Sequence, residues 1–221
     1  MIVTAEPTAP TRTEQLAGVL QCIAGSGSVV LRSRTYDGIG EQDLIVTPPY
    51  SLPLPLITLI LDRWSVRLAP ITRAAGGQLL DLPTAFVVWH PPTEVVDRAP
   101  RVTAAAQRTI AAALRTMPPV SLLIDGAHEV VAGWRLERPL TDLHQAKALL
   151  VGLAERLGGE TTPLEDLAAF DVPFAGIVRN WSGTNHEYIH LDEVNPTRRY
   201  ALTALAQTPP AKPATTRRIP S

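Results

Sequence analysis

The chain has 221 residues, 45% of them hydrophobic, and its 20 basic and 21 acidic side chains give a formal net charge of -1. This length is enough for one domain with a sizeable core, and the balanced charge lacks the strongly basic character of a dedicated nucleic-acid-binding protein. Cys22 is the only cysteine, which excludes an internal disulfide and a cysteine-based zinc site and agrees with a cytoplasmic location. The longest apolar run, near 52–61, is interrupted by prolines and falls short of the roughly 20 residues that span a bilayer, so we expect no membrane contact.

The two ends have compositions typical of unfolded segments. Residues 1–12 contain two prolines and several threonines, and residues 207–221 contain four prolines with three basic side chains and no acid. Such segments bury too little apolar surface to offset the entropy of ordering. We therefore expect a single domain at 13–206 between a disordered start and a disordered basic tail.

The first part of the chain predicts a helix, two strands and a second helix. Apolar residues recur at helical spacing between Thr13 and Ile23, just before two glycines. Residues 28–34 begin apolar and then alternate as a strand does, and a glycine-containing turn separates them from a second strand at 44–46. The segment 56–66 has a spacing of apolar residues that suits a short buried helix.

The second part interleaves strands with helices. We expect, in order, a buried strand at 85–89, an alanine-rich helix at 101–117, two strands around Gly126, a helix from 141 to 157 and two last strands at 176–179 and 188–191. Gly158 is placed to end the long helix, because glycine adopts the left-handed conformation without penalty. This alternation predicts an α/β or α+β protein, a sheet with helices packed on it.

Residues 122–136 read Leu-Leu-Ile-Asp-Gly-Ala-His-Glu-Val-Val-Ala-Gly-Trp-Arg-Leu. This stretch resembles the central strand-turn-strand of archaeo-eukaryotic primase-polymerases, in which an apolar run leads to a Ser-x-His motif and a Trp-x-Leu. The resemblance is clearest from Ala85 to Tyr200 and implies an RRM-like catalytic sheet. It also implies an Asp-x-Asp, the Ser-x-His and a further Asp, whose carboxylates hold divalent metal ions for phosphoryl transfer.

The first of these motifs is changed. Trp89, His90 and two prolines follow the strand at 86–88, where the resemblance places the first acids. Mg²⁺ prefers carboxylate oxygens, and neither Trp nor Pro is a ligand. Glu94 and Asp97 lie just downstream as substitutes, with a solvated loop as the alternative.

The second motif has two possible registers. Anchored on Trp134, the alignment puts Val131 at the His position and Gly126 at the Ser position. Anchored on Gly126 instead, it keeps His128 as the phosphate contact. We favour the first register, because it aligns the flanking residues without a gap, and it makes His128 a turn residue.

Two further stretches extend the resemblance. Residues 165–168 read Glu-Asp-Leu-Ala and make Asp166 the candidate for the third acid, with a helix cap or a surface charge as the alternative. Arg179 and Asn185 have the separation found in an Arg-x-Pro-Gly-Thr-x-Asn-x-Lys turn that meets the nucleotide or template. Glu187 replaces the Lys of that turn, and its charge repels phosphate by on the order of 1 kcal/mol.

A zinc-protease motif is also present, since His186 to His190 spells His-Glu-x-x-His. A protease needs this motif on a helix, so that both imidazoles face one metal. Tyr188 and Ile189 favour a strand, in which the two histidines would be about 13 Å apart. The metalloprotease therefore remains a minor alternative.

Together these features predict a primase-polymerase-like protein of a plasmid, phage or integrated element that has lost metal-dependent catalysis and serves DNA replication as a nucleic-acid-binding or assembly subunit. Its expected partners are single-stranded DNA or a primer-template and a replicative helicase or polymerase subunit, and no cofactor is expected. The candidate nucleic-acid-binding residues are Arg179, Trp181, Asn185, Arg198 and Arg199. Two alternatives stay open. One is an active Mg²⁺- or Mn²⁺-dependent primase or polymerase that uses Glu94 or Asp97 with His128 and Asp166. The other is a protein-protein adaptor that binds no nucleic acid.

Overall fold

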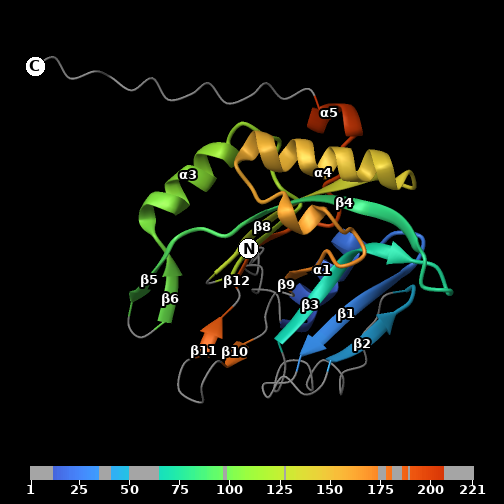
Figure 1. Cartoon of the computed structure of the whole chain (residues 1–221), viewed down its shortest axis with the longest axis horizontal. Coiled ribbons are helices and arrows are strands. Elements are labelled where there is room, and N and C mark those ends of the chain that lie inside the picture. Colours follow the sequence, from blue (N-terminus) through green and yellow to red (C-terminus); the bar gives the residue numbers. More distant parts are fainter. Residues whose placement is uncertain are drawn as a thin grey trace, which may run out of the picture.

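One curled antiparallel sheet organises the part of the chain that the computed structural model describes, which is residues 12–34, 41–49, 65–96, 99–126, 128–173, 178–180, 186–188 and 190–206 (Figure 1). The strands of this sheet are, in chain order, β1 (Ser28–Arg34), β2 (Glu41–Val46), β3 (Ser65–Arg73), β4 (Leu79–Trp89), β7 (Leu122–Asp125), β8 (Val130–Leu140), β9 (Val172–Pro173) and β12 (His190–Val194). They lie in the order β12-β7-β8-β4-β3-β1-β2, with β9 beside β3. Each of these pairings is antiparallel.

Helices and two small hairpins complete the described chain. The helices are α1 (Arg12–Ile23), α3 (Ala104–Leu114), α4 (Leu143–Leu157) and α5 (Leu202–Ala206), with the 3₁₀ helix η1 (Thr162–Leu164) after α4. The hairpins pair β5 (Thr93–Val96) with β6 (Ala99–Val102) and β10 (Val178–Asn180) with β11 (His186–Tyr188). In these ranges, no helix has both the length and the apolar character needed to cross a bilayer.

Helices cover both faces of the sheet. Successive side chains of a strand point to opposite sides, so a central strand such as β4 contacts a helix on each face. On one face of β4, the Thr84 hydroxyl donates a hydrogen bond to the carbonyl of Cys22 in α1. On the other face, the Trp89 indole donates to the carbonyl of Leu157 in α4, with an N to O distance of 3.2 Å. β4 is therefore a central strand, buried from Asp81 to Trp89.

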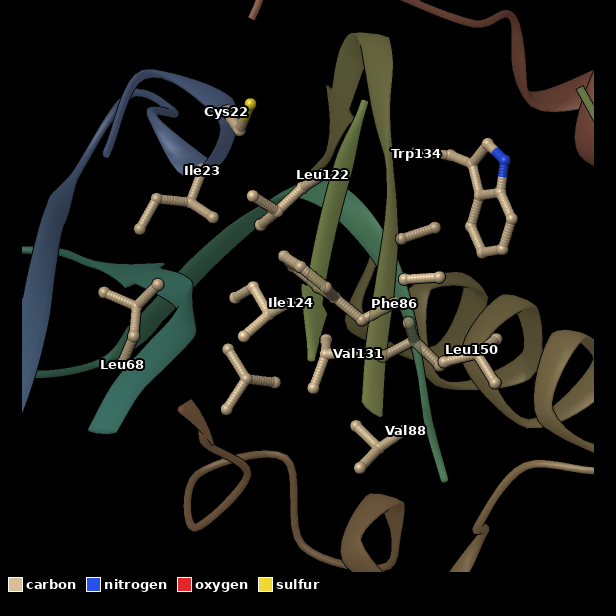
Figure 2. Packing of buried hydrophobic residues seen from close by; sticks show 14 of the residues in the cluster. Cys22, Ile23, Leu68, Phe86, Val88, Leu122, Ile124, Val131, Trp134 and Leu150 are labelled. Atoms are coloured by element: carbon tan, nitrogen blue, oxygen red, sulfur yellow. The ribbon is translucent and has the colours of Figure 1, made fainter. Parts of the chain in front are cut away.

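The hydrophobic core lies between these layers. Figure 2 shows Ile23 of α1 and Leu150 of α4 on opposite sides of the strands that carry Phe86 and Val131. All four side chains are fully buried. Burial of each large apolar side chain contributes about 2 to 3 kcal/mol, so the centre of the sheet is a rigid support for the residues at its edges.

Most of the elements predicted from the sequence are confirmed. Helices α1 and α4, strands β1, β2 and β4, and the β7–β8 hairpin lie where the apolar spacing places them. Gly158 ends α4 in the left-handed conformation, with φ of 69°. The predicted fold class is also confirmed, since a mixed α+β sheet carries the helices.

Three predicted elements are wrong in part. The helix expected at 56–66 is contradicted at its end, where residues 65 and 66 begin β3, and residues 56–64 lie outside the described ranges. The alanine-rich helix is shorter than predicted, because Arg101 and Val102 belong to β6. Tyr188 pairs with Val178 as expected, but the following residues form a separate strand, β12, beside β7.

The zinc-protease alternative is wrong, because His186 belongs to β11 and His190 to β12, not to one helix; residue 189 is outside the described ranges. The expected disordered ends, 1–12 and 207–221, also lie outside the described residues, apart from Arg12, which begins α1.

Candidate functional site

A hollow of about 570 Å³ lies beside the ends of β4 and β8, against β3 and the segment that follows α4. Four carboxylates, one guanidinium and two imidazoles line it together with smaller and apolar side chains. The lining residues are Arg67, Val88, His90, His128, Glu129, Thr162, Pro163, Glu165, Asp166, Ala169, Phe170 and Asp171. The hollow is therefore acidic even with Arg67 counted.

Arg67 on β3 is bound by two carboxylates at one side of the hollow. Its Nη1 and Nη2 donate to the two carboxylate oxygens of Glu129 at 2.5 and 3.1 Å. Its Nε donates to the carboxylate of Asp171, and Nη2 also donates to the Asp171 carbonyl oxygen at 3.1 Å. All five donors of a guanidinium lie in one plane, so this geometry fixes the two acids relative to each other.

Arg67, Glu129 and Asp171 form a cluster, here called the Arg67 cluster. Their charges interact strongly because the side chains are largely buried. Exposed fractions are 21% for the Arg67 side chain, 10% for Glu129 and 17% for Asp171. Burial opposes the charged form of Arg67, but the hydrogen bonds and charges of Glu129 and then Asp171 outweigh it and raise the pKa of Arg67. The guanidinium is a permanent cation between these two acids.

Arginines from two neighbouring strands hold the segment 168–171 that forms one wall of the hollow. Arg32 on β1 donates to the carbonyls of Ala168 and Ala169 at 2.7 and 3.0 Å. Arg73 on β3 donates to the same Ala168 carbonyl at 2.8 Å. Arg32 lies directly opposite Arg67 in the sheet, and like charges in such a position destabilise a strand pair. Asp171 accepts from both and offsets that repulsion.

The β7–β8 turn places an imidazole at the hollow. Gly126 and Glu129 exchange backbone hydrogen bonds of 2.8 and 3.3 Å, which closes a tight turn that carries His128. A second imidazole, that of His90, follows β4 and has its Nε2 3.9 Å from the Glu129 carboxylate. Both histidines thus lie beside the Arg67 cluster.

The hollow brings together the three stretches that resemble primase-polymerase motifs. Val88 and His90 come from the end of β4, His128 and Glu129 from the β7–β8 turn, and Asp166 from the segment after α4. These stretches are far apart in the sequence, and only the fold places them at one site.

The structure bears on the two registers of the second motif. Val131, which the favoured register puts at the His position, is fully buried in the core. His128, which the other register keeps, lines the hollow. The side chain that meets the hollow is therefore the one that the favoured register treats as a turn residue.

Of the other catalytic candidates among the described residues, one lines the hollow and one does not. Asp166 lines the hollow, and its Oδ1 also accepts from the Ala168 amide at 2.9 Å, so it caps the turn that follows η1. Glu94 is exposed on β5 and does not line the hollow. Asp97 lies outside the described residues.

Of the nucleic-acid-binding candidates, Arg198 and Arg199 do not line the hollow. Arg179 pairs through its backbone with Glu187 in the β10–β11 hairpin, and Trp181 and Asn185 lie outside the described residues. Arg198 donates to the Val120 carbonyl and to the Glu193 carboxylate at 3.0 Å, so its charge is compensated within the protein. Arg199 is exposed.

Sequence reasoning missed Arg67, Glu129 and Asp171. Glu129 is only 8% exposed, and a buried acid has no signature in a single sequence. The sequence around Asp171 does carry a weak signal. Asp171 stands between Phe170 and Val172, which are both buried, and an acid inside an apolar run usually has a partner.

The divalent ions that the resemblance implies do not fit this arrangement. Among the described residues, no three histidine, cysteine, aspartate or glutamate side chains are grouped so that they could hold a metal ion. The two most buried acids of the hollow, Glu129 and Asp171, direct their oxygens at Arg67. The guanidinium already supplies the positive charge that these carboxylates need.

Comparisons with known proteins concern the fold. No protein-family model matches the sequence, and no curated protein matches it either. Two solved structures are similar. The crystal structure of primase RepB' has a TM-score of 0.59 at 11% identity, with 88% of this chain and 60% of that chain covered. The catalytic domain of primase RepB' in complex with initiator DNA has a TM-score of 0.57 at 11% identity, with 89% and 93% covered. The chain thus spans about 60% of the first structure, and its fold is similar to that of a replication primase catalytic domain.

Proposed function

We propose that this protein is a primase-like subunit of a replication system, of a plasmid, phage or integrated element, that binds nucleic acid and no longer performs metal-dependent nucleotide transfer. The primase-like fold supports the first half of this proposal. The hollow supports the second half. It brings together the stretches that resemble the motifs, but its two most buried acids, Glu129 and Asp171, are bound to Arg67.

The observation that carries the proposal is the bonding of Arg67. Two-metal phosphoryl transfer needs carboxylate oxygens that face the ions and hold them. Here the oxygens of Glu129 and Asp171 accept from a guanidinium that is itself held on β3. Turning the Glu129 carboxylate toward an ion would break its two hydrogen bonds to a guanidinium whose side chain is only 21% exposed.

Nucleic acid is the proposed ligand because one of the similar structures is a primase domain in complex with initiator DNA. The proposed contact surface is separate from the hollow, since four carboxylates there repel phosphate. A single-stranded template or a primer-template junction is the expected form, and a replicative helicase or polymerase is the expected protein partner.

Primer synthesis and primer extension on single-stranded DNA test the loss of catalysis. Purified protein with Mg²⁺ or Mn²⁺ and all nucleotides is expected to give no template-dependent product. A product that disappears in Asp166→Ala and persists in Asp142→Ala, an exposed N-cap acid of α4 away from the hollow, would overturn the proposal.

Binding to a labelled single-stranded oligonucleotide tests the nucleic-acid half. Affinity should fall steeply with salt, because binding to phosphates releases counterions. An absence of binding even at low salt would leave the protein-protein adaptor as the better account.

An active primase or polymerase is a second candidate, and one observation favours it. His128 and Asp166, which the atypical active set requires, line the same hollow. The extension assay separates the two candidates, since only an active enzyme requires Asp166 for a product.

A further inference from the structure

A pair of arginines lies outside the hollow, where β8 meets the turn that follows β12. Arg135 is partly buried on β8, and Arg199 is exposed just after the turn. Their backbones are tied together, because the amide of Tyr200 donates to the Arg135 carbonyl at 2.8 Å. Leu136 and Tyr200 form a parallel bridge at the same place.

The position of both arginines is fixed by buried hydrogen bonds. Ser121 has no exposed surface, and its hydroxyl donates to the Arg198 carbonyl at 2.8 Å and accepts from the Arg135 amide at 3.0 Å. The Ser121 carbonyl accepts from the Asn195 amide at 2.7 Å. The Arg135 guanidinium adds a bond of 3.0 Å to the Pro196 carbonyl. Both guanidinium groups are thus carried by rigid backbone.

The positive charges of Arg135 and Arg199 repel each other. Burial lowers the pKa of Arg135, and the charge of Arg199 lowers it further. Glu193 pairs with Arg198 instead, at 3.0 Å. Glu137 follows two residues along β8, yet in the described part of the chain no ion pair joins any acid to Arg135 or Arg199.

We propose that Arg135 and Arg199 form a clamp for a backbone phosphate of single-stranded nucleic acid. A phosphodiester carries a negative charge, and two guanidinium groups can donate to its oxygens together. The clamp rests on the proposed nucleic-acid binding and gives it a location, at the middle of β8 and outside the acidic hollow beside the start of that strand. Arg198, whose charge Glu193 compensates, is not part of it.

The test compares Arg199→Gln with Arg108→Gln, which removes an exposed arginine from α3 and leaves the clamp intact. Binding of a fluorescent oligothymidylate is measured by anisotropy over a series of salt concentrations. Arg199→Gln is expected to weaken binding about tenfold near 50 mM salt and to reduce the slope of log K against log salt by about 0.7, the value for one phosphate contact of a single strand. Arg108→Gln should leave both unchanged.

The possible outcomes separate the clamp from the proposed function. If Arg199→Gln bound the oligonucleotide as tightly as wild type and with the same salt slope, the clamp would be overturned and the proposed function would stand. No binding by wild-type protein would overturn both. Arg135→Lys keeps the charge and loses the planar guanidinium, so its affinity should lie between those of wild type and Arg199→Gln. If the strand is the ligand, inorganic phosphate should compete only at a much higher concentration than the oligonucleotide. Equal competition by free phosphate would contradict the strand as the ligand.

Discussion

Arg67 has the largest structural role of any single side chain at the hollow. It joins β3 to the β7–β8 turn through Glu129 and to the segment before β9 through Asp171. Because its side chain is only 21% exposed, neither acid regains full hydration if the guanidinium is removed. The stability of this end of the sheet therefore depends on a charge balance and not on packing alone.

Arg67→Met should lower the free energy of unfolding by about 3 kcal/mol, because two largely buried carboxylates lose their partner. Chemical unfolding followed by fluorescence of the tryptophans measures this change. In the Arg67→Met background, Glu129→Gln should recover part of the loss, since it removes one of the unpaired charges. A single variant within 0.5 kcal/mol of wild type, or a double variant less stable than the single one, would contradict this role.

Cys22 predicts a dependence of stability on alkaline pH. Burial raises the pKa of its thiol from 9.0 to about 11, against smaller opposing effects of the Arg135 charge and the Asn195 backbone. Between these values the unfolded chain releases the thiol proton and the folded chain keeps it, so stability falls as pH rises above about 9. The expected loss between pH 8 and pH 10 is about 1.4 kcal/mol.

Cys22→Ala isolates this effect, because it removes the thiol and leaves the other titrating groups in place. Its stability is expected to be lower overall but to change less between pH 8 and pH 10 than that of wild type. Identical pH profiles for the two proteins would show that the thiol ionises equally in both states.

At the level of single elements, two glycines of the α4 region make opposite predictions. Gly152 lies inside the helix with no atom within 4 Å of an added Cβ, so Gly152→Ala should stabilise the protein by about 1 kcal/mol through helix propensity. At Gly159 an added Cβ would overlap Val87 Cγ1 and would lie 2.9 Å from the Val88 carbonyl oxygen. Gly159→Ala should therefore destabilise the contact between α4 and β4.

Thermal unfolding of the two variants beside wild type measures both effects. The matched pair matters because each change adds one methyl group. If both variants shifted the melting temperature in the same direction, the close packing of α4 against β4 would be wrong.

Elements with regular apolar spacing could be predicted from the sequence, whereas β3 and the first part of β4 (79–84) could not, and each of these contains a proline. β3 contains Pro70 and β4 contains Pro83, and proline in a run argues against a strand. Both prolines lie at irregular points of the sheet: the β1–β3 register shifts near Pro70, and the β4–β8 register shifts between Leu82 and Thr84. Proline has no amide to donate and is found in sheets at bulges, and both strands continue through these residues.

The candidate site could be predicted only in part, because its contacts join distant residues. His128 and Asp166 carried a motif resemblance and do lie at the hollow. Arg67 lies 62 residues from Glu129 and 104 from Asp171, and it belongs to β3, a strand that the sequence did not predict. No local pattern reveals such a cluster.

On the scale of the whole molecule, the fold is similar to that of a primase catalytic domain, and Arg67 binds the two most buried acids of its hollow. Mn²⁺ binding to the purified protein, followed by loss of the free-ion paramagnetic resonance signal with and without nucleotide, tests this most directly. We predict no saturable binding at submillimolar Mn²⁺ beyond that of the nucleotide alone. Saturable binding of one or two ions that is lost in both Asp166→Ala and Glu129→Gln, in protein that remains folded, would contradict the account.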